Sequence, residues 1–333
     1  MRRFFAVGNG LFAMESKYGL TSVYDCGSTS QSTIDMAIDG ALNTHRGEIE
    51  NVFISHYDKD HVNGILKLLA AYPVKRVILP MIPELARVIN SSTVKDSFQY
   101  NFILSPERVI QEISPQTDVI HIGNRDFEED NQQLLHERVE LQNIENSTVL
   151  QSNFQILGIH DWLYVIYNKR ILTYAELTSF YNNLGLTTNA TSDEIISALR
   201  RMSKATNLKK AIEAIFSDTE LSKINDYSMV VWSGRREIRE GCLYTGDYNA
   251  KKNITDIHKV YANFLRGTEI IQIPHHGSNP YFHPNICLPH AAHIVSAHYG
   301  PYSRQRVDPR QTINAILRLG HTCLDTRYGD VIL

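Results

Sequence analysis

Four side chains that can bind a metal ion occur within six residues of the segment SHYDKDHVNG, residues 55–64: His56, Asp58, Asp60 and His61. In an extended backbone His56 and Asp58 point to the same side, while Asp60 and His61 begin the turn into a helix-like run. Imidazole and carboxylate ligands together suit Zn²⁺, Mn²⁺ or Fe²⁺, so this pattern can serve two adjacent ions. The alternative interpretation is a solvated turn in which Asp60 caps the following helix.

Two further motifs in the last third of the chain carry groups of the same chemistry. TGD, residues 245–247, places Asp247 where one carboxylate could bridge two cations, although TGD by itself is a common turn. PHHGS, residues 274–278, contains His275 and His276, and two adjacent histidines seldom serve packing alone. We therefore interpret the three motifs together as parts of one metal site.

The elements around these motifs are expected to bring them together. Apolar runs at 52–54, 242–244 and 270–273 predict strands that end just before the motifs, and 62–71 has the spacing of a helix. Strands followed by helices predict a layered α/β or α+β domain. The loops after these strands are then expected to converge at one edge of a sheet, where sites are commonly built.

The segment from about Gln132 to Lys223 differs, because helical periodicity replaces the strand pattern. Ser192 is predicted to cap a helix that has acidic residues in its first turn. We expect an amphipathic helix pair packed on the main domain. The alternative is a lid whose basic face meets an anionic substrate, and that face would contain Arg200, Arg201, Lys204, Lys209 and Lys210.

Composition narrows the class of protein. The 333 residues are 43% hydrophobic and 21% charged, and the net charge of −3 exerts no general attraction on nucleic acid or anionic membranes. The four cysteines form no C-x-x-C pair, which favours free thiols in a reducing compartment. No run approaches the ~20 apolar residues of a membrane span, and glycines interrupt the N-terminal apolar run too early for a signal peptide. We therefore expect a cytoplasmic protein without membrane contacts.

The motifs resemble those of the metallo-β-lactamase superfamily, whose signature loop reads H-x-[HD]-x-D-H. The variant with aspartate in the second position, followed by TGD and PHHGS, is similar to the hydrolase domain of ComEC-type DNA-internalisation proteins. AVGNG, VYDCG and NDYSMVV resemble further motifs of that family, and the resemblance spans residues 4–79 and 225–333. It implies an α/β (α+β) fold, a four-layer αββα sandwich. The expected division is two halves of that domain, 1–131 and 224–333, separated by a mainly helical insertion, 132–223.

The resemblance also implies a role for each motif residue. His56 and Asp58 would hold one divalent ion, Zn²⁺ or Mn²⁺, and Asp247 would bridge it to a second. The ligands of the second ion would be Asp60, His61 and His276, with His275 either the ligand in place of His276 or a substrate contact. Asn225 or Asp226 stands where many members have a third histidine, so the first ion is expected to be held weakly.

Such a site predicts hydrolysis. Two cations sharing Asp247 would lower the pKa of a bridging water and supply hydroxide at neutral pH. Asp60 would orient that hydroxide, and His275 or His298 would protonate the leaving group. Asp25 would support a ligand histidine from behind. The remaining predicted contacts are with the substrate, from Ser278, Asn225 and Asp226.

We expect a phosphodiesterase or nuclease that acts on nucleic acid or a nucleotide. The carboxylate of Asp58 adds hard oxygen donors, which suit Mn²⁺ and leave waters exchangeable for phosphate oxygens. The loop SAHYGPYSRQRVDP, residues 296–309, departs from the family pattern, so substrate choice is expected to differ there. The rival functions are hydrolysis of another ester, such as a lactone, thioester or phosphocholine ester, and a non-catalytic metal-binding module.

Overall fold

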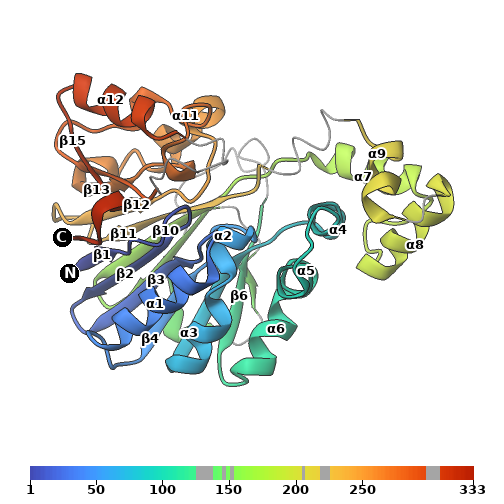
Figure 1. The fold of residues 1–333 in the computed structure, drawn as a ribbon, viewed down its shortest axis with the longest axis horizontal. Helices are drawn as coiled ribbons and strands as arrows, with labels where there is room; N and C mark the ends of the chain where they lie inside the picture. The colour runs from blue at the N-terminus through green and yellow to red at the C-terminus, as the bar shows by residue number, and fades with distance from the viewer. Residues whose placement is uncertain (125–137, 145–147, 151–153, 205–206, 218–225, 298–307) are drawn as a thin grey trace.

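The computed structural model describes the chain except for residues 125–137, 145–147, 151–153, 205–206, 218–225 and 298–307. In this described part, two mixed sheets of eight strands face each other (Figure 1). The order across the first sheet is β16 (Val331–Ile332), β1 (Arg2–Phe4), β2 (Phe12–Lys17), β3 (Leu20–Cys26), β4 (Ile49–Phe53), β5 (Val74–Pro80), β6 (Asp118–Ile122) and β8 (Val149–Leu150). The order across the second is β15 (Thr322–Asp325), β14 (Ala292–Val295), β13 (Thr268–Gln272), β12 (Gly241–Tyr244), β11 (Met229–Gly234), β10 (Trp162–Asn168), β9 (Phe154–Ile159) and β7 (Arg138–Glu140).

The central strands of the first sheet are parallel and buried on both faces. Successive side chains of a strand point to opposite faces. The register places residues that point to the same face beside one another across β3, β4, β5 and β6. The residues that pack toward the outer helices are Val23, Val52, Val77 and Val119. Those that pack between the two sheets are Tyr24, Phe53, Ile78 and Ile120. Burial of both rows explains why these strands read as nearly continuous apolar runs.

Helices cover the outer face of each sheet. On the first sheet lie α1 (Gln31–Leu42), α3 (Ile65–Ala71), α4 (Glu84–Ser91), α5 (Ser97–Leu104) and α6 (Pro106–Ile113). On the second lie α11 (Ala250–Val260) and α12 (Arg310–Arg318). The three hydrophobic clusters of the chain thus lie between helices and sheet on each side and between the two sheets. The predicted four-layer αββα sandwich is confirmed.

The turns that carry the motif residues lie at a common edge of the two sheets. Strands β3 and β4 run parallel in the first sheet, and β12, β13 and β14 run parallel in the second. The carboxyl ends of parallel strands meet at one edge, so the turns after them are neighbours. The Met229 N–H donates to the Ser55 carbonyl oxygen at 2.8 Å and links the two sheets directly at this edge.

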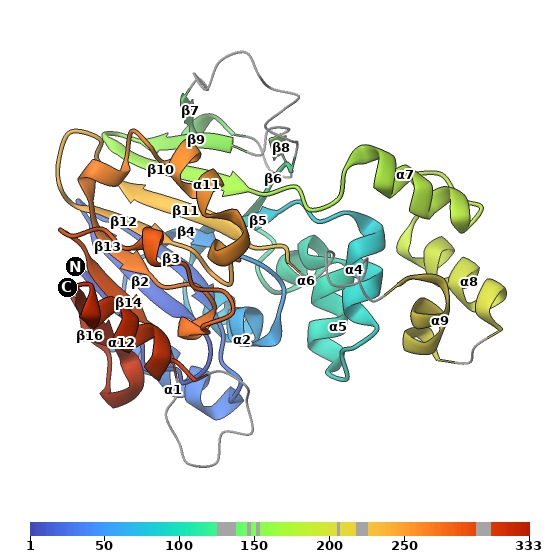
Figure 2. The same ribbon diagram turned by 90° about the horizontal axis from the view of Figure 1, so that it is seen from above.

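The segment 132–223 contains both strands and helices. Its described residues include β9 and β10, which belong to the second sheet, and then α7 (Tyr174–Asn183), α8 (Ser192–Ser203) and α9 (Leu208–Ile215). These three helices lie beyond α4, away from the sandwich (Figure 2). Helix α8 packs on α4, where the Ser192 N–H donates to Glu84 Oε1 at 3.1 Å. The predicted domain boundaries remain a prediction.

Helix α8 begins one residue earlier than expected. Its N-cap is Thr191, whose hydroxyl accepts from the Glu194 N–H while the Glu194 carboxylate accepts from the Thr191 N–H. This capping box satisfies two N–H groups at once, so the prediction of Ser192 as the cap was wrong. Across the described residues, none of the helices combines the length with the apolar run that crossing a membrane requires.

Candidate metal centre

The two histidines of the motif loop between β4 and α2 (Lys59–Val62) are buried. His56 is 6% exposed and His61 is fully buried. Asp58 occupies the N-cap position of α2 without a capping hydrogen bond, and Asp60 lies inside the helix. The alternative of a solvated turn capped by Asp60 is therefore excluded.

Close backbone packing holds the motif loop against the turns of the first sheet. The Leu11 N–H donates to the Asp60 carbonyl oxygen at 3.1 Å. A Cβ on Gly27 would lie 2.3 Å from the His61 backbone nitrogen, so only glycine allows these two backbones to approach so closely. The turns VGNG and DCG noted in the sequence thus position Asp60 and His61.

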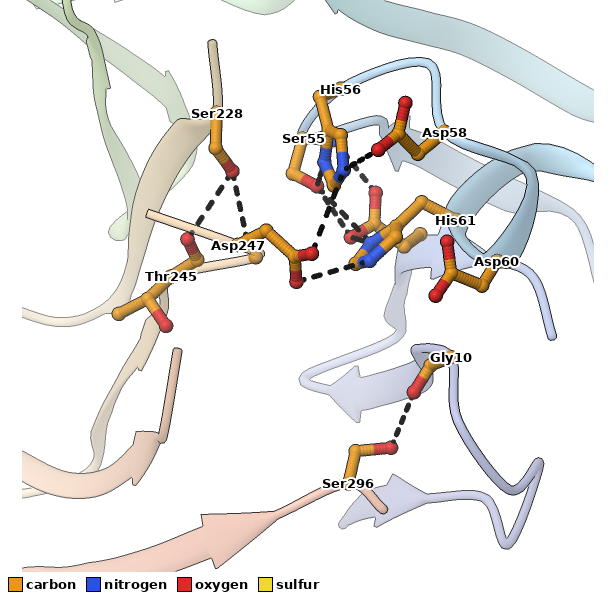
Figure 3. A network of polar contacts seen from close by, with 12 residues as sticks. Gly10, Ser55, His56, Asp58, Asp60, His61, Ser228, Thr245, Asp247 and Ser296 are labelled. Carbon is orange, nitrogen blue, oxygen red and sulfur yellow. Dashed lines mark hydrogen bonds and ion pairs between the residues drawn. The ribbon is translucent and has the colours of Figure 1, made fainter. Parts of the chain in front are cut away.

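Asp247, in the turn after β12, lies at the centre of the site (Figure 3). Its Oδ1 is 3.2 Å from His61 Nε2 and 3.6 Å from His276 Nε2. Its Oδ2 is 3.8 Å from His56 Nε2 and 3.6 Å from His275 Nε2. Each carboxylate oxygen therefore faces a different pair of imidazoles, which is the arrangement that a bridging carboxylate needs.

Within the described part of the chain, two groups of three residues could each hold a metal ion, because their ligand atoms all lie within 4.8 Å of one another. One group is Asp60, His61 and His276, and the other is His56, His61 and Asp247. Within the first group, Asp60 Oδ2 is 3.3 Å from His276 Nε2. Asp58 stands at the rim, with Oδ2 3.6 Å from His56 Nε2 and 64% of its side chain exposed.

Asp25 and Ser55 support two of the histidines from behind. Asp25 Oδ2 accepts from His61 Nδ1 at 2.7 Å, and the Asp25 oxygens also accept from the N–H and the hydroxyl of Ser55. The Ser55 hydroxyl oxygen lies 3.0 Å from His56 Nδ1 and can accept a hydrogen bond from that N–H group. With Nδ1 protonated, the neutral ring presents the lone pair of Nε2, the atom that faces Asp247.

His276 is oriented in the same way by the second sheet. Its Nδ1 donates to the Ser296 carbonyl oxygen at 3.0 Å, just beyond β14. The Ser296 hydroxyl donates to the Gly10 carbonyl oxygen at 2.7 Å, which ties this support to the first sheet (Figure 3). Both sheets therefore contribute to the orientation of one ligand.

Three buried polar atoms at the centre of the site have no hydrogen-bond partner among the described residues: His61 Nε2, His276 Nε2 and Asp247 Oδ1. Such atoms are rarely left unpaired inside a folded protein. Imidazole nitrogen and carboxylate oxygen are also donors that Zn²⁺ and Mn²⁺ accept. The residues present therefore fit a divalent metal ion.

The electrostatics of the site favour cations. Burial by itself would raise the pKa of Asp60, but His276, whose Nε2 lies 3.3 Å from Asp60 Oδ2, and the charge of His61 lower it to about 2. Burial is likewise outweighed at Asp247, whose pKa falls well below the ordinary value because His61, His276 and His275 surround it. At His61, burial would lower the pKa, but Asp247 and Asp25 raise it well above the usual range. Carboxylates that stay ionised this strongly also attract a metal ion.

His275 differs from its neighbour in exposure and contacts. Both histidines have backbone in the left-handed region, with φ of 50° for His275 and 54° for His276, a conformation that costs free energy and often marks a functional turn. The His275 ring stacks on Tyr281, with centroids 3.9 Å apart. Burial lowers the pKa of His275, although Asp247 acts in the opposite direction. Both histidines thus face Asp247, His275 on the side of Oδ2 and His276 on the side of Oδ1.

A cavity of about 580 Å³ opens from the cluster, a size within the usual range for a small-molecule site. Its lining includes His56, Asp58, Asp60, Asp247 and His275 together with the connection between α4 and α5. None of the five basic residues proposed above for a lid face on α8 and α9 lines it, and all five are exposed.

The other predicted site residues have different surroundings. Asp226 lines the cavity and accepts from Lys252 Nζ at 3.0 Å. Ser278 is buried and is not among the residues that line the cavity. His298 and Asn225 lie outside the described residues, so their predicted roles stay predictions.

Sequence reasoning missed Ser55, Ser296 and Tyr281. Ser55 precedes the signature loop directly and could have been noticed there. Ser296 supports His276 through its backbone carbonyl oxygen, and any residue type supplies that atom. Tyr281 follows PHHGS closely, but a stacking partner cannot be told from a core tyrosine by its position.

Asp25→Asn is expected to weaken metal binding about 10- to 100-fold, as removal of a supporting carboxylate typically does. The amide keeps the shape but loses the charge that holds the proton on His61 Nδ1. Competition against a chromogenic chelator gives the dissociation constant for Zn²⁺ or Mn²⁺. Asp39→Asn, an exposed carboxylate on α1, is the matched control. An unaltered dissociation constant in Asp25→Asn would contradict the supporting role.

The fold was compared with known proteins. Neither a protein-family model nor a curated protein matches the chain. Among solved structures, it is similar to the short form of human tRNase Z, at 10% identity and a TM-score of 0.41, over 100% of this chain and 99% of that one. It is also similar to the metallo-β-lactamase fold protein YhfI from Bacillus subtilis, at 10% identity and a TM-score of 0.42, over 99% and 98% of the two chains.

A third similar structure is a mutant metallo-β-lactamase from Cronobacter sakazakii, at 11% identity and a TM-score of 0.32, over 78% of this chain and 71% of that one. At TM-scores below 0.5 these alignments say nothing about activity. The layers and strand orders of the chain itself form the predicted αββα sandwich. The nearer resemblance to the ComEC-type branch stays a prediction.

Proposed function

We propose that the chain is a metal-dependent hydrolase that cleaves phosphodiester bonds in nucleic acid or a nucleotide. The observation that carries the proposal is the position of Asp247, whose two oxygens each face a separate pair of imidazoles at the end of an open cavity. A non-catalytic metal-binding module would have no need of a cavity at its ligands.

The donors divide between two ions. Asp60, His61 and His276 would hold one, with Asp247 Oδ1. His56 and Asp58 would hold the other, with Asp247 Oδ2, and we add His275 to this set because its Nε2 faces that same oxygen. That nitrogen would compensate for the histidine that the sequence lacks near Asp226. The predicted role of His275 in protonating the leaving group remains a prediction.

Bound divalent ions would supply a nucleophilic hydroxide from water near neutral pH and would neutralise charge on the phosphate. The chain's own residues prepare that chemistry. Asp25 and the Ser296 carbonyl oxygen hold protons on the Nδ1 atoms of His61 and His276 and so keep their Nε2 atoms available. Asp60, held at its backbone by Leu11, would orient the attacking oxygen. The His275–Tyr281 stack forms a wall against which the substrate can lie.

Phosphodiesters are favoured over lactams and lactones by the carboxylate of Asp58 in the first set of donors. The exposed carboxylate of Asp58 is a hard ligand, which suits Mn²⁺ and leaves positions on the ion for phosphate oxygens. A β-lactam antibiotic, which presents one lactam carbonyl and one carboxylate, would make less use of such positions. The preference for Mn²⁺ is part of the proposal.

The test is a substrate panel run with added Mn²⁺ or Zn²⁺. We expect turnover of bis-p-nitrophenyl phosphate and of oligonucleotides, stimulated by Mn²⁺, and negligible turnover of nitrocefin and a homoserine lactone. Elemental analysis of protein purified without chelator should show one to two equivalents of transition metal. Faster turnover of nitrocefin or the lactone than of every phosphodiester would overturn the proposal, and so would protein that binds no metal after its addition.

A further inference from the structure

The cavity beside the cluster contains two lysines whose charges the cluster does not explain. Lys59 lies in the signature loop between Asp58 and Asp60, at the start of α2, and is half-buried. Lys95 also lines the cavity, lies in the connection between α4 and α5 and is exposed. Among the described residues, no carboxylate lies within 4.0 Å of either ammonium group.

Every carboxylate that lines the cavity is engaged elsewhere. Asp60 and Asp247 belong to the metal cluster, and Asp58 stands beside His56 at its rim. Asp226 accepts from Lys252. Asp96, although adjacent to Lys95, caps α5 by accepting from the Gln99 N–H at 2.9 Å. The two lysines are therefore free to bind an anion that enters the cavity.

The wall that carries Lys95 is an ordered part of the fold. The Val94 N–H donates to the Ser91 carbonyl oxygen at 3.1 Å, which continues the end of α4 into the connection. Helix α5 contacts the motif loop, where Gln99 Nε2 lies 3.4 Å from the Tyr57 carbonyl oxygen. Helix α4 is held on its other side by α8. The backbone on either side of Lys95 is thus tied to α4 and, through α5, to the motif loop.

We propose that Lys59 and Lys95 form a subsite for a second phosphate group, so that the preferred substrate carries another phosphate next to the bond that is cleaved. This inference rests on the proposed phosphodiesterase function. The scissile phosphate would be neutralised at the metal cluster, whereas two ammonium groups bind a further phosphate as point charges. Lactones and simple thioesters have no such group, and the cation of a phosphocholine ester would be repelled.

The first experiment measures binding without hydrolysis. Isothermal titration calorimetry with thymidine 3′,5′-bisphosphate and with thymidine 5′-monophosphate, on metal-loaded protein, compares ligands that lack a diester bond. We expect the bisphosphate to bind about tenfold more tightly for each ammonium that contacts it. Lys95→Gln should lose most of that preference, and Lys95→Arg should keep it. Equal affinity of the parent protein for both ligands would overturn the subsite.

The second experiment measures hydrolysis of the thymidine dinucleotide TpT beside pTpT and TpTp, which carry one additional terminal phosphate. The ratio of kcat/KM for the better phosphorylated dinucleotide to that for TpT should approach a hundred in the parent and fall about tenfold in each of Lys95→Gln and Lys59→Gln. Lys259→Gln, an exposed lysine of α11 outside the cavity, should keep the parent's ratio. Elemental analysis of Lys59→Gln checks that its neighbouring ligands still hold metal.

The outcomes separate this inference from the function on which it rests. Hydrolysis of all three dinucleotides at equal kcat/KM would overturn the second-phosphate subsite and leave the phosphodiesterase in place. Hydrolysis of none, together with turnover of another ester, would overturn the phosphodiesterase itself. A preference that survives in both lysine variants and disappears when Arg200 and Arg201 are neutralised would place the anion site on α8 instead and overturn the inference.

Discussion

Asp247→Ala is expected to lower kcat on a phosphodiester by at least about 10³-fold, because it removes the carboxylate shared by both sets of metal donors. Asp247 is the residue whose two oxygens face His61 and His276 on one side and His56 and His275 on the other. Without it, the four imidazoles lose the carboxylate that lies within 4 Å of all of them. Metal content should fall together with activity.

The conservative variant Asp247→Asn makes the test sharper. The amide keeps the size of the side chain and one carbonyl oxygen, so a loss of activity reports the missing charge and the missing second oxygen. Circular dichroism and urea denaturation establish that each variant is folded, and Asp39→Asn serves as the control carboxylate. If Asp247→Asn and Asp247→Ala both retained two equivalents of metal and parental turnover, the assignment of the bridging ligand would be wrong.

Gly27→Ala is expected to damage the site through its backbone. The added methyl would lie 2.3 Å from the His61 nitrogen and 2.4 Å from the Asp60 carbonyl carbon. Both are main-chain atoms, so the start of α2 must shift, and overpacking of this kind costs about 1–3 kcal/mol of unfolding free energy. A displacement of about 1 Å at the ligands is enough to lower kcat about 10²-fold.

Gly40→Ala is the matched control for this effect. Gly40 lies inside α1, where an added Cβ would meet nothing within 4 Å. Alanine favours helix over glycine by about 1 kcal/mol, so this variant should be as stable as the parent or more so. Urea denaturation and steady-state kinetics measure both quantities. Equal stability and equal kcat in Gly27→Ala and Gly40→Ala would show that the close approach of the two turns is unimportant.

The sequence alone determined the features that depend on residue type and short spacing. The alternation of His56 and Asp58, the turn at Asp60 and His61, and the strand endings before Asp247 and His275 are local patterns. Because parallel strands present their carboxyl ends at one edge, these patterns were enough to predict a shared site and a layered α/β or α+β domain. The four-layer sandwich was predicted from the family resemblance. The ligand chemistry followed from the side chains themselves.

Only the tertiary structure decided which atoms meet. Asp25 supports His61 across 36 positions of the chain, and Ser296 links to Gly10 across 286. No local pattern encodes such a contact, because it depends on how the two sheets pack. The same packing aims His275 and His276 at different oxygens of Asp247, a distinction that two adjacent identical residues could not reveal.

The middle of the chain shows the same division between local pattern and long-range packing. Helical periodicity correctly indicated α8 and α9, but Ser192 and Thr191 are equally suitable caps by type, and only the capping box with Glu194 selects Thr191. The pairing of β10 with β11 and the packing of α8 on α4 are contacts between distant segments. Lys95 lines the cavity from the connection between α4 and α5, a position that no motif indicated, whereas Lys59 belongs to the motif loop itself.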